Sequence, residues 1–505
     1  MTRSRRLRFA AITAAGACLL AAPPPTATAQ PATAQPGTAH RTYDVRDFGA
    51  TGDGTTLDDD AIDRAIDAAA AGPGRGTVLF PPGTYKSRTI HLKSDLTLHL
   101  AKGATLLAAP GGMDEAEPNP WDAYQDFGHS HFRNALLTGE NIHRLAITGS
   151  GTLDGEGLGT SNTLEPGVGD KILSLKRCAD LDIKDVTFTR GGHFALLLNG
   201  CDGVRMTRTK VLTSTDRDAV NLINSRHVDI GHSRIEGRDD GVVLKSDYAL
   251  GRTYTSHDIR VHDSDVLSTE NNALQFGSET CGDFRDIRFD RLRVGGGGKA
   301  AIGIVSMDGA DISDVRYSDI TMTKGATPVF VKIGDRKRCP GAPPAGRIHD
   351  IAFDNVTGTG LTHPVTGVDY TSTITGAPGA DVEDITFHRV RLTVPGGHPA
   401  SDADLVPGEY LDDYVPKTYG VRPSYGWWIR HAKDITFTDS TVRTDTGDDR
   451  PAFIADDGAA ITLDRVTAQR GAASPYDVGF SGVSGPVVRH STTTDGEALR
   501  VRTTP

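Results

Sequence analysis

The chain has 505 residues, five cysteines and a formal net charge of −11 at pH 7. This charge argues against a nucleic acid or a membrane surface as partner, because both attract proteins through a basic field, and a polyanionic substrate would need local cations. The length fits either two or three ordinary domains or one elongated β architecture, so it does not decide the fold.

The first 29 residues have the features of a secretory signal peptide. Four arginines precede an apolar run from Phe9 to Ala22, and Ala27-Thr28-Ala29 offers an A-x-A cleavage site. A lipoprotein is the alternative, since Cys18 lies in the apolar run, but Ala15 stands where a lipid-attachment motif has a Leu-like residue. No later stretch approaches the roughly 18 apolar residues of a membrane span. We expect a secreted, extracellular protein that starts near Gln30, with a disordered linker over 30–40.

The segment 58–71 predicts one amphipathic helix. Ile62, Ala65, Ile66 and Ala69 recur at helical spacing, which places them on one face. A helix there could cap the N-terminal end of a repetitive fold and cover an open sheet edge.

A short alternating strand recurs along the chain from residue 145 to residue 463. The shortest intervals are 23 residues, from Ile183 to Met206, and 24 residues, from Met206 to Ile230. This is the length of one coil of a β-solenoid, in which stacked coils bury a continuous core. A propeller would repeat at about 40 residues or more, and a leucine-rich repeat would show its Leu/Asn signature. We predict an all-β, right-handed parallel β-helix over 41–490, followed by a C-terminal tail over 491–505.

A second strand in each coil places side chains of equal offset in columns, with about 4.8 Å between neighbouring strands. Just before five such strands, one column contains Phe194, Asp218, Asp240, Asn272 and Ala300. The adjacent column contains His193, Arg217, Asp239, Asn271 and Lys299. The alignment therefore brings three carboxylates together where two coils meet.

These carboxylates are the candidate catalytic residues. Two like charges stacked one coil apart resist joint ionisation, so Asp218 and Asp240 are expected to titrate as a pair that holds one proton tightly. Cleavage of a glycosidic bond needs such separated proton affinities, because one group protonates the leaving oxygen while another activates water. The alternative is that the acids cap backbone amides or lie in solvent, but a third aspartate in register favours the catalytic interpretation.

Several neighbours are candidate substrate-binding residues. His193 and Phe194 could stack against a sugar ring, or simply pack in the ladder. Asn221 and Gln275 share an outward column and could donate hydrogen bonds to hydroxyl groups. Lys245 could offer positive charge, or be a solvated surface lysine.

Two insertions carry further aromatic residues. Trp121, Tyr124 and Phe127 could overhang the cleft, and so could Trp427 and Trp428, although each could equally anchor its loop. A long insertion from Gly397 to Gly426 could close one end of the groove and favour exo action.

Four cysteines remain after signal cleavage: Cys178, Cys201, Cys281 and Cys339. They could form two disulfides of undetermined connectivity, although stacking in one column would also explain Cys178 and Cys201. No CxxC motif or histidine-rich cluster indicates a metal, and no cofactor is predicted. We expect a monomer.

Five motifs in combination resemble glycoside hydrolase family 28, the polygalacturonase family, over residues 41 to about 470. They are Tyr43–Ala50 with Gly52–Gly54, Phe80–Tyr85, Ile147–Gly155, Asp239-Asp240 with Lys245-Ser246, and Tyr419–His431. The resemblance implies an inverting hydrolase of a pectin-like polysaccharide. It also implies that Asp239 is the general acid and that Asp218 and Asp240 position and deprotonate the water.

The sequence departs from this family in three places. Asn271-Asn272-Ala273 stands where the family has Gly-His-Gly, so the resemblance places Asn272 at the position of an active-site histidine. Gly303-Ile304-Val305 replaces the Arg-Ile-Lys that grips a uronate carboxylate. Arg217 replaces a threonine, and its charge beside Asp239 would favour the ionised form of that acid. A neutral or differently charged sugar thus becomes plausible next to the scissile bond.

Two rival functions share this architecture. A polysaccharide lyase would need calcium-binding carboxylates and an Arg or Lys base, and would give unsaturated products that absorb in the ultraviolet. A non-catalytic carbohydrate-binding or adhesive solenoid would bind without releasing reducing ends.

Overall fold

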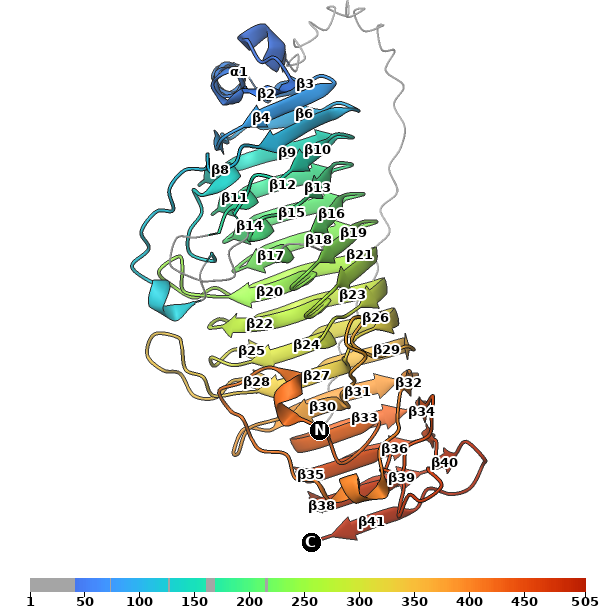
Figure 1. The fold of residues 1–505 in the computed structure, drawn as a ribbon. Coiled ribbons are helices and arrows are strands. Elements are labelled where there is room, and N and C mark those ends of the chain that lie inside the picture. The colour runs from blue at the N-terminus through green and yellow to red at the C-terminus, as the bar shows by residue number, and fades with distance from the viewer. Residues whose placement is uncertain (1–40, 73, 126–127, 160–168, 214–216) are drawn as a thin grey trace, which may run out of the picture. The chain divides into compact units, whose positions relative to one another are not determined.

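The computed structural model describes residues 41–72, 74–125, 128–159, 169–213 and 217–505. The predicted signal peptide and linker lie outside these residues, and so does Phe127. Within the described ranges, the strands stack in parallel along one axis, from α1 (Asp59–Ala71) at one end to β41 (Val501–Thr504) at the other (Figure 1). No helix of these ranges is both long and apolar enough to cross a membrane. The predicted parallel β-helix is confirmed.

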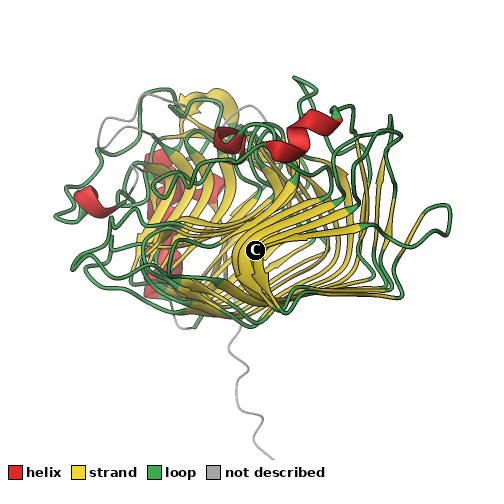
Figure 2. Ribbon diagram, turned by 90° about the horizontal axis from the view of Figure 1, so that it is seen from below, coloured by secondary structure: helices red, strands yellow, loops and turns green. Residues whose placement is uncertain are grey.

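Three parallel sheets run along the solenoid, and Figure 2 shows their strands stacked behind one another with loops around the outside. The first sheet, which we call the site sheet, contains β5 (Ile90–His91), β8 (Ala135–Glu140), β11 (Lys171–Lys176), β14 (Phe194–Asn199), β17 (Asp218–Ile223), β20 (Val242–Ser246), β22 (Leu274–Thr280), β24 (Ala300–Ser306), β27 (Thr327–Ile333), β30 (Ser372–Thr375), the start of β33 (Trp427–Thr438), β35 (Phe453–Ala459), β38 (Val478–Ser484) and β41.

The second sheet contains β1 (Thr42–Asp44), β3 (Gly76–Phe80), β6 (Leu96–Leu100), β9 (His143–Gly149), β12 (Ala179–Lys184), β15 (Asp202–Thr207), β18 (Arg226–Gly231), β21 (Ser256–Ser268), β23 (Phe284–Gly295), β26 (Val315–Lys324), β29 (Ile351–Gly358), β31 (Val382–His388), the end of β33, β36 (Thr462–Asp464) and β39 (Val487–Arg489). These strands include the short alternating repeat that the sequence predicted.

The third sheet contains β2 (Asp53–Leu57), β4 (Gly83–Ser87), β7 (Ala104–Ala108), β10 (Thr152–Asp154), β13 (Thr187–Thr189), β16 (Lys210–Thr213), β19 (Arg234–Gly237), the later parts of β21, β23, β26 and β29, then β32 (Arg391–Val394), β34 (Thr441–Thr444), β37 (Thr467–Ala468) and β40 (Thr492–Thr493). Two short strands, β25 (Asp311–Ile312) and β28 (Arg347–Ile348), pair with each other beside β23.

The core follows from alternation, because every second side chain of a strand points inward and meets its equivalent on the next coil. Leu181, Val204, Val228 and Ile259 form one such buried column. Further along, five aromatic rings stack with centroid separations of 4.5–4.8 Å: Phe289, Tyr317, Phe353, Phe387 and Phe437. Each coil thus buries its apolar face only against its neighbours.

Left-handed backbone at fixed positions turns the chain between the second and third sheets. Asp185, Arg208, His232, Asp263 and Arg291 occupy this position on successive coils, with φ between 49° and 66°. Non-glycine residues rarely adopt this conformation, and aspartate and asparagine tolerate it best. The same corner recurs on each coil, and aspartate occupies it in two of these five coils.

The two ends of the solenoid differ from each other. Helix α1 packs against β1, β3, β5 and β6 at the N-terminal end, which confirms the predicted cap helix. At the other end β41 pairs with β38, so strands continue through the segment that we expected to be a tail. Disulfides join Cys178 to Cys201 and Cys281 to Cys339, so the first pair is bonded as well as stacked.

Candidate active site

The predicted columns form on the site sheet. Phe194 pairs with Asp218, and the pairings Val220–Val242 and Val242–Leu274 carry the same register onward to Asp240 and Asn272. One carboxylate oxygen each from Asp218, Asp239 and Asp240 lie within 4.8 Å of one another. The sequence register therefore places the three acids in one cluster.

Asp218 lies at the start of β17 and is almost fully buried. Its Oδ2 is 3.2 Å from Lys245 Nζ, and its Oδ1 accepts a hydrogen bond from the backbone of Asp240. Burial raises the pKa of Asp218, while the charge of Lys245 opposes that shift. Burial would lower the pKa of Lys245, but Asp218, Glu279 and Asp240 outweigh it and raise the pKa above its usual value.

Asp239 is the most open of the three acids, with 19% of its side chain exposed. Arg217 Nη2 lies 3.3 Å from its Oδ2, and Asn271 Nδ2 donates to its Oδ1. Burial would raise the pKa of Asp239, but Lys299, Arg217 and the bond from Asn271 outweigh it and hold the pKa below its ordinary value. Asp239 is thus a carboxylate in the free protein.

Asp240 is the acid that retains a proton. Its Oδ1 accepts hydrogen bonds from the backbone nitrogen of Asn272 at 3.1 Å and from Asn272 Nδ2 at 2.9 Å. Burial and the charges of Asp239 and Asp218 raise the pKa of Asp240 to about 7. The three acids therefore have separated proton affinities, as expected for stacked like charges.

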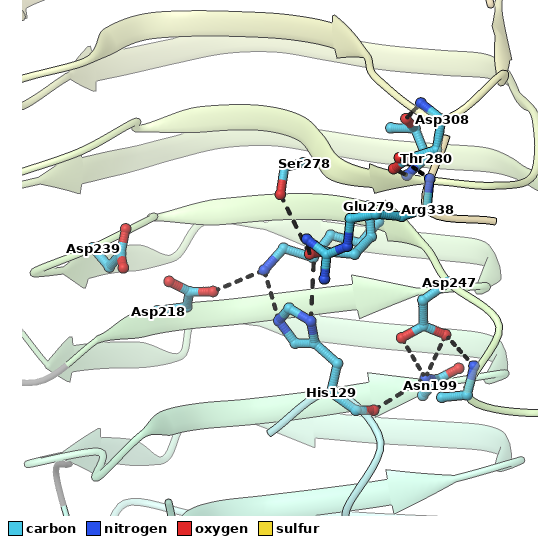
Figure 3. A network of polar contacts seen from close by, with 12 residues as sticks. His129, Asn199, Asp218, Asp239, Asp247, Ser278, Glu279, Thr280, Asp308 and Arg338 are labelled. Atoms are coloured by element: carbon cyan, nitrogen blue, oxygen red, sulfur yellow. Dashed lines mark hydrogen bonds and ion pairs between the residues drawn. The ribbon is translucent and has the colours of Figure 1, made fainter. Parts of the chain in front are cut away.

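A polar network continues from Asp218 into the protein (Figure 3). Lys245 Nζ donates to His129 Nε2 at 2.9 Å, so His129 carries its proton on Nδ1, which lies 3.7 Å from Glu279 Oε2. Arg338 Nη1 lies 3.7 Å from the other oxygen of Glu279. Lys245 is therefore not a solvated surface lysine, because it is buried and links Asp218 to His129.

The sequence interpretation did not single out His129 or Glu279. His129 comes from the 109–134 insertion, where Trp121 and Tyr124 pack on Tyr248 and so hold the loop. Glu279 follows a register shift between β20 and β22. The docking of a loop, which places His129, and a β-bulge, which places Glu279, leave no periodic pattern in the sequence. Only the three-dimensional structure therefore reveals these two residues.

The acids lie at the edge of a polar pocket. It is lined by His129, Phe194, Arg217, Asp218, Asp239, Asp240, Lys245, Gln275, Gly277, Ser278, Glu279, Lys299 and Tyr414. Tyr414 belongs to the Gly397–Gly426 insertion, and Lys299 Nζ lies 5.0 Å from the centre of its ring. This insertion therefore reaches the site.

Other predicted binding residues have different positions. Phe194 lines the pocket and stacks on His129 at 5.1 Å, but only 1% of it is exposed, whereas His193 is fully buried behind it. Asn221 is also fully buried, and Gln275 lines the pocket with its Nε2 bonded to the carbonyl of Phe276. His193 and Asn221, which we expected to contact the substrate, are fully buried, so a ligand in the pocket does not reach either side chain.

Trp427 and Trp428, which we expected to overhang the cleft, are core residues as well. Trp427 packs at an angle against Phe387 and Phe437, and Trp428 is fully buried with its Nε1 donating a hydrogen bond to Asp456. They anchor the coil and do not overhang the cleft.

The described residues contain two groups that could hold a metal ion, which are the three acids and the surface trio His232, His262 and Asp263. In the trio, Arg291 already binds both oxygens of Asp263. In the acid cluster, Lys245 and Arg217 already supply positive charge.

Comparison with known proteins decides the family. Glycosyl hydrolases family 28 matches residues 123–407, which is more than half of the chain. The chain belongs to this family. It is a polygalacturonase-like glycoside hydrolase, which acts on O-glycosyl bonds.

Individual relatives agree with this assignment. An exo-poly-alpha-D-galacturonosidase of Dickeya chrysanthemi is 37% identical over 127 residues, covering 23% of this chain and 20% of that protein. An exopolygalacturonase of Zea mays is 25% identical over 365 residues, covering 64% of this chain and 77% of that protein. The solved family 28 exopolygalacturonase of Yersinia enterocolitica shares the fold, with a TM-score of 0.60, 17% identity, and coverage of 85% of this chain and 78% of that one.

The departures from the family pattern have structural counterparts in this hydrolase. Asn272 bonds Asp240 from the position of the family histidine, and its Oδ1 accepts from the backbone of Ala300 at 3.1 Å. At Gly303, where the resemblance implies an arginine, an added Cβ would collide with Gln275 Oε1. Gln275 thus occupies the space that a side chain at position 303 would need.

Proposed function

We propose that this protein is a secreted enzyme that hydrolyses a pectin-like polysaccharide with inversion, using Asp218, Asp239 and Asp240. The observation that carries the proposal is the cluster of three carboxylates in one pocket, each in a different electrostatic environment. Acid/base cleavage needs one protonated and one ionised carboxyl group beside the scissile bond. The triad supplies both near neutral pH, because a pKa of about 7 keeps Asp240 partly protonated there while the lowered pKa of Asp239 keeps it ionised.

Roles within the triad follow from the resemblance and from position. Asp239 is the acid with the most exposed side chain, which suits the group that protonates the leaving oxygen. Asp218 and Asp240 stack one coil apart at the more buried end, which suits a pair that holds and deprotonates one water. This assignment requires the proton to reach Asp239 when substrate is bound.

The proposal of inversion has a specific geometric requirement. Carboxyl groups of inverting enzymes usually stand roughly 6.5–9.5 Å apart, whereas those of retaining enzymes stand roughly 5–5.5 Å apart. Here one carboxylate oxygen of each of the three acids lies within 4.8 Å of the other two. The attacking water must therefore be held beside Asp218 and Asp240, because there is no wide gap between acid and base. Proton NMR of the first product decides the point, and retained anomeric configuration would overturn inversion.

The proposed substrate rests on the relatives and on the pocket. The named relatives are galacturonan-degrading enzymes, and Arg217, Lys299 and Lys245 place positive charge around the site of an otherwise acidic protein. We therefore expect reducing sugar to be released from polygalacturonic acid. Asp239→Asn should lower that release at least a hundredfold, since general acid/base groups contribute roughly 10²–10⁴-fold.

The matched control is Asp229→Asn, a half-exposed aspartate on β18 that pairs with His262 away from the pocket lining. Equal release by Asp239→Asn and the wild type would remove the catalytic assignment. Ultraviolet-absorbing products and loss of activity in EDTA would identify a lyase instead. Binding without any release would identify a non-catalytic solenoid. Secretion is checked by sequencing the N-terminus of exported protein, which should begin near Gln30.

A further inference from the structure

Both oxygens of Asp239 already have partners, and one of these partners, Arg217, lines the pocket. Oδ2 lies 3.3 Å from Arg217 Nη2, and Oδ1 accepts a hydrogen bond from Asn271. Arg217 exposes 24% of its side chain and Asp239 19%, so a ligand in the pocket can reach this ion pair. An ionised carboxylate held in this way cannot protonate a leaving group.

The cations that hold Asp239 ionised are also those that an acidic sugar would meet. Lys299 lines the pocket over the ring of Tyr414, and Arg217 lines it beside Asp239. The third cation, Lys245, is 95% buried and already binds Asp218 and His129. Position 303, where the resemblance implies an arginine, is a glycine, and the side chain of Gln275 lies against it. A carboxylate in the pocket therefore competes with Asp239 for Arg217 and Lys299.

We propose that Arg217 and Lys299 bind the carboxylate of an acidic sugar, and that this transfer of partners from Asp239 to the sugar moves a proton onto Asp239. The inference rests on the proposed function and deepens it, because it makes the charge of the substrate part of catalysis. Arg217 and Lys299 become specificity-determining residues that a neutral sugar cannot engage.

The proton comes from within the triad. In the free protein Asp240 is the proton donor of the triad, because its pKa is raised to about 7, while the charges of Lys299, Arg217 and Lys245 hold the pKa of Asp239 low. When the cations turn to the sugar, Asp239 is left beside like charges, and its affinity for a proton rises. One proton passes from the carboxyl of Asp240 to the carboxylate of Asp239, and no other bond changes. Asp240 is then ionised beside Asp218 and can accept a proton from water.

A binding experiment tests the competition without relying on activity. Asp239→Asn removes the negative partner of Arg217, so Arg217 can turn to the ligand. We expect this variant to bind trigalacturonate roughly tenfold more tightly than the wild type by calorimetry, the scale of one charge-assisted hydrogen bond. The affinity for a neutral galactose trisaccharide should not change.

The double variant Asp239→Asn/Arg217→Thr separates this competition from general electrostatics. The gain in affinity for trigalacturonate that Asp239→Asn produces should disappear in this double variant. It should persist in the double variant Asp239→Asn/Arg238→Thr. Arg238 is a matched control because it is also a neighbouring arginine, but it pairs with Glu270 and is absent from the pocket lining. A gain that survives removal of Arg217 would overturn the proposal, and Arg217→Gln repeats the test if the threonine variant does not fold.

A kinetic experiment tests the consequence for specificity. The ratio of kcat/KM for polygalacturonic acid to that for its methyl ester should fall roughly tenfold in Arg217→Thr and stay unchanged in Arg238→Thr. An unchanged ratio in an active Arg217→Thr enzyme would contradict the inference but not the hydrolase function. A wild type that cleaves neither polymer would contradict the proposed function, while the binding cycle would still report on Arg217 and Asp239.

Discussion

Lys245 and Asp218 form an ion pair inside the protein, with Nζ 3.2 Å from Oδ2 and with 7% and 4% of the two side chains exposed. A buried pair is not a strong source of stability by itself, because both ions lose their hydration. Removing one partner is costly, however, since the other charge stays buried alone. Removing Lys245 should therefore destabilise the folded protein, because it would leave the candidate catalytic residue Asp218 charged and buried without a partner.

Lys245→Met is expected to lower the free energy of unfolding by about 3 kcal/mol. Methionine has about the same length as lysine but no charge, so the substitution leaves Asp218 without its cation. Urea denaturation at pH 7 measures the loss in the free energy of unfolding. Lys433→Met is the control, because Lys433 pairs with Glu383 on the surface and such pairs contribute less than about 1 kcal/mol. Equal losses in both variants would show that Asp218 does not depend on Lys245.

Asp240→Asn is expected to stabilise the protein at pH 8 while abolishing hydrolysis. The folded-state pKa of about 7 lies above the ordinary value of 3.8, so the native state binds the proton more tightly than the unfolded state does. Stability contributed by this group is thus present below pH 4 and is lost as pH rises towards 7. The asparagine carries no charge to bury, so its advantage over the wild type at pH 8 should approach about 4 kcal/mol, since the two pKa values differ by about 3.

Urea denaturation of Asp240→Asn and the wild type at pH 5 and pH 8 measures this difference. The comparison between the two proteins is needed because Asp247 is also buried, with a pKa raised to about 7, and contributes its own slope to both. An asparagine variant less stable than the wild type at pH 8 would mean that Asp240 is stabilised in its ionised form.

Tyr414→Ala is expected to raise KM about fivefold and to leave kcat within about twofold. The ring of Tyr414 lies 5.0 Å from Lys299 Nζ, and a cation–π contact of this kind contributes about 1 kcal/mol. Tyr410→Ala is the control from the same insertion, since Tyr410 packs against Tyr419 and does not line the pocket. Initial-rate kinetics on polygalacturonic acid would refute this role if both variants changed KM alike.

Loss of the Cys281–Cys339 disulfide is expected to lower the free energy of unfolding by about 4 kcal/mol. The bond closes a loop with a sequence separation of 58, and chain entropy predicts this loss for a loop of that length. The Cys178–Cys201 bond has a separation of 23 and should contribute about 3 kcal/mol. Double cysteine-to-serine variants in urea measure both, and the reverse order would argue against the entropic explanation.

Much of the site could be predicted because the solenoid repeats. Equivalent strands recur once per coil, so aligning them brings Asp218, Asp239 and Asp240 together although the intervals differ in length, and their register is confirmed. The same periodicity did not predict the burial of His193 and Asn221. A column identifies the residues that share an offset, but it does not show which of them other parts of the chain cover.

The sequence by itself determined the β-helix, its coil length and the convergence of three aspartates, because these follow from local alternation and from equal spacing between coils. Only the tertiary structure decided that Lys245 is buried and that His129 and Tyr414 reach the pocket. The physical reason is that insertions dock through packing that no repeat encodes, and that burial and neighbouring charge set the proton affinity of each acid.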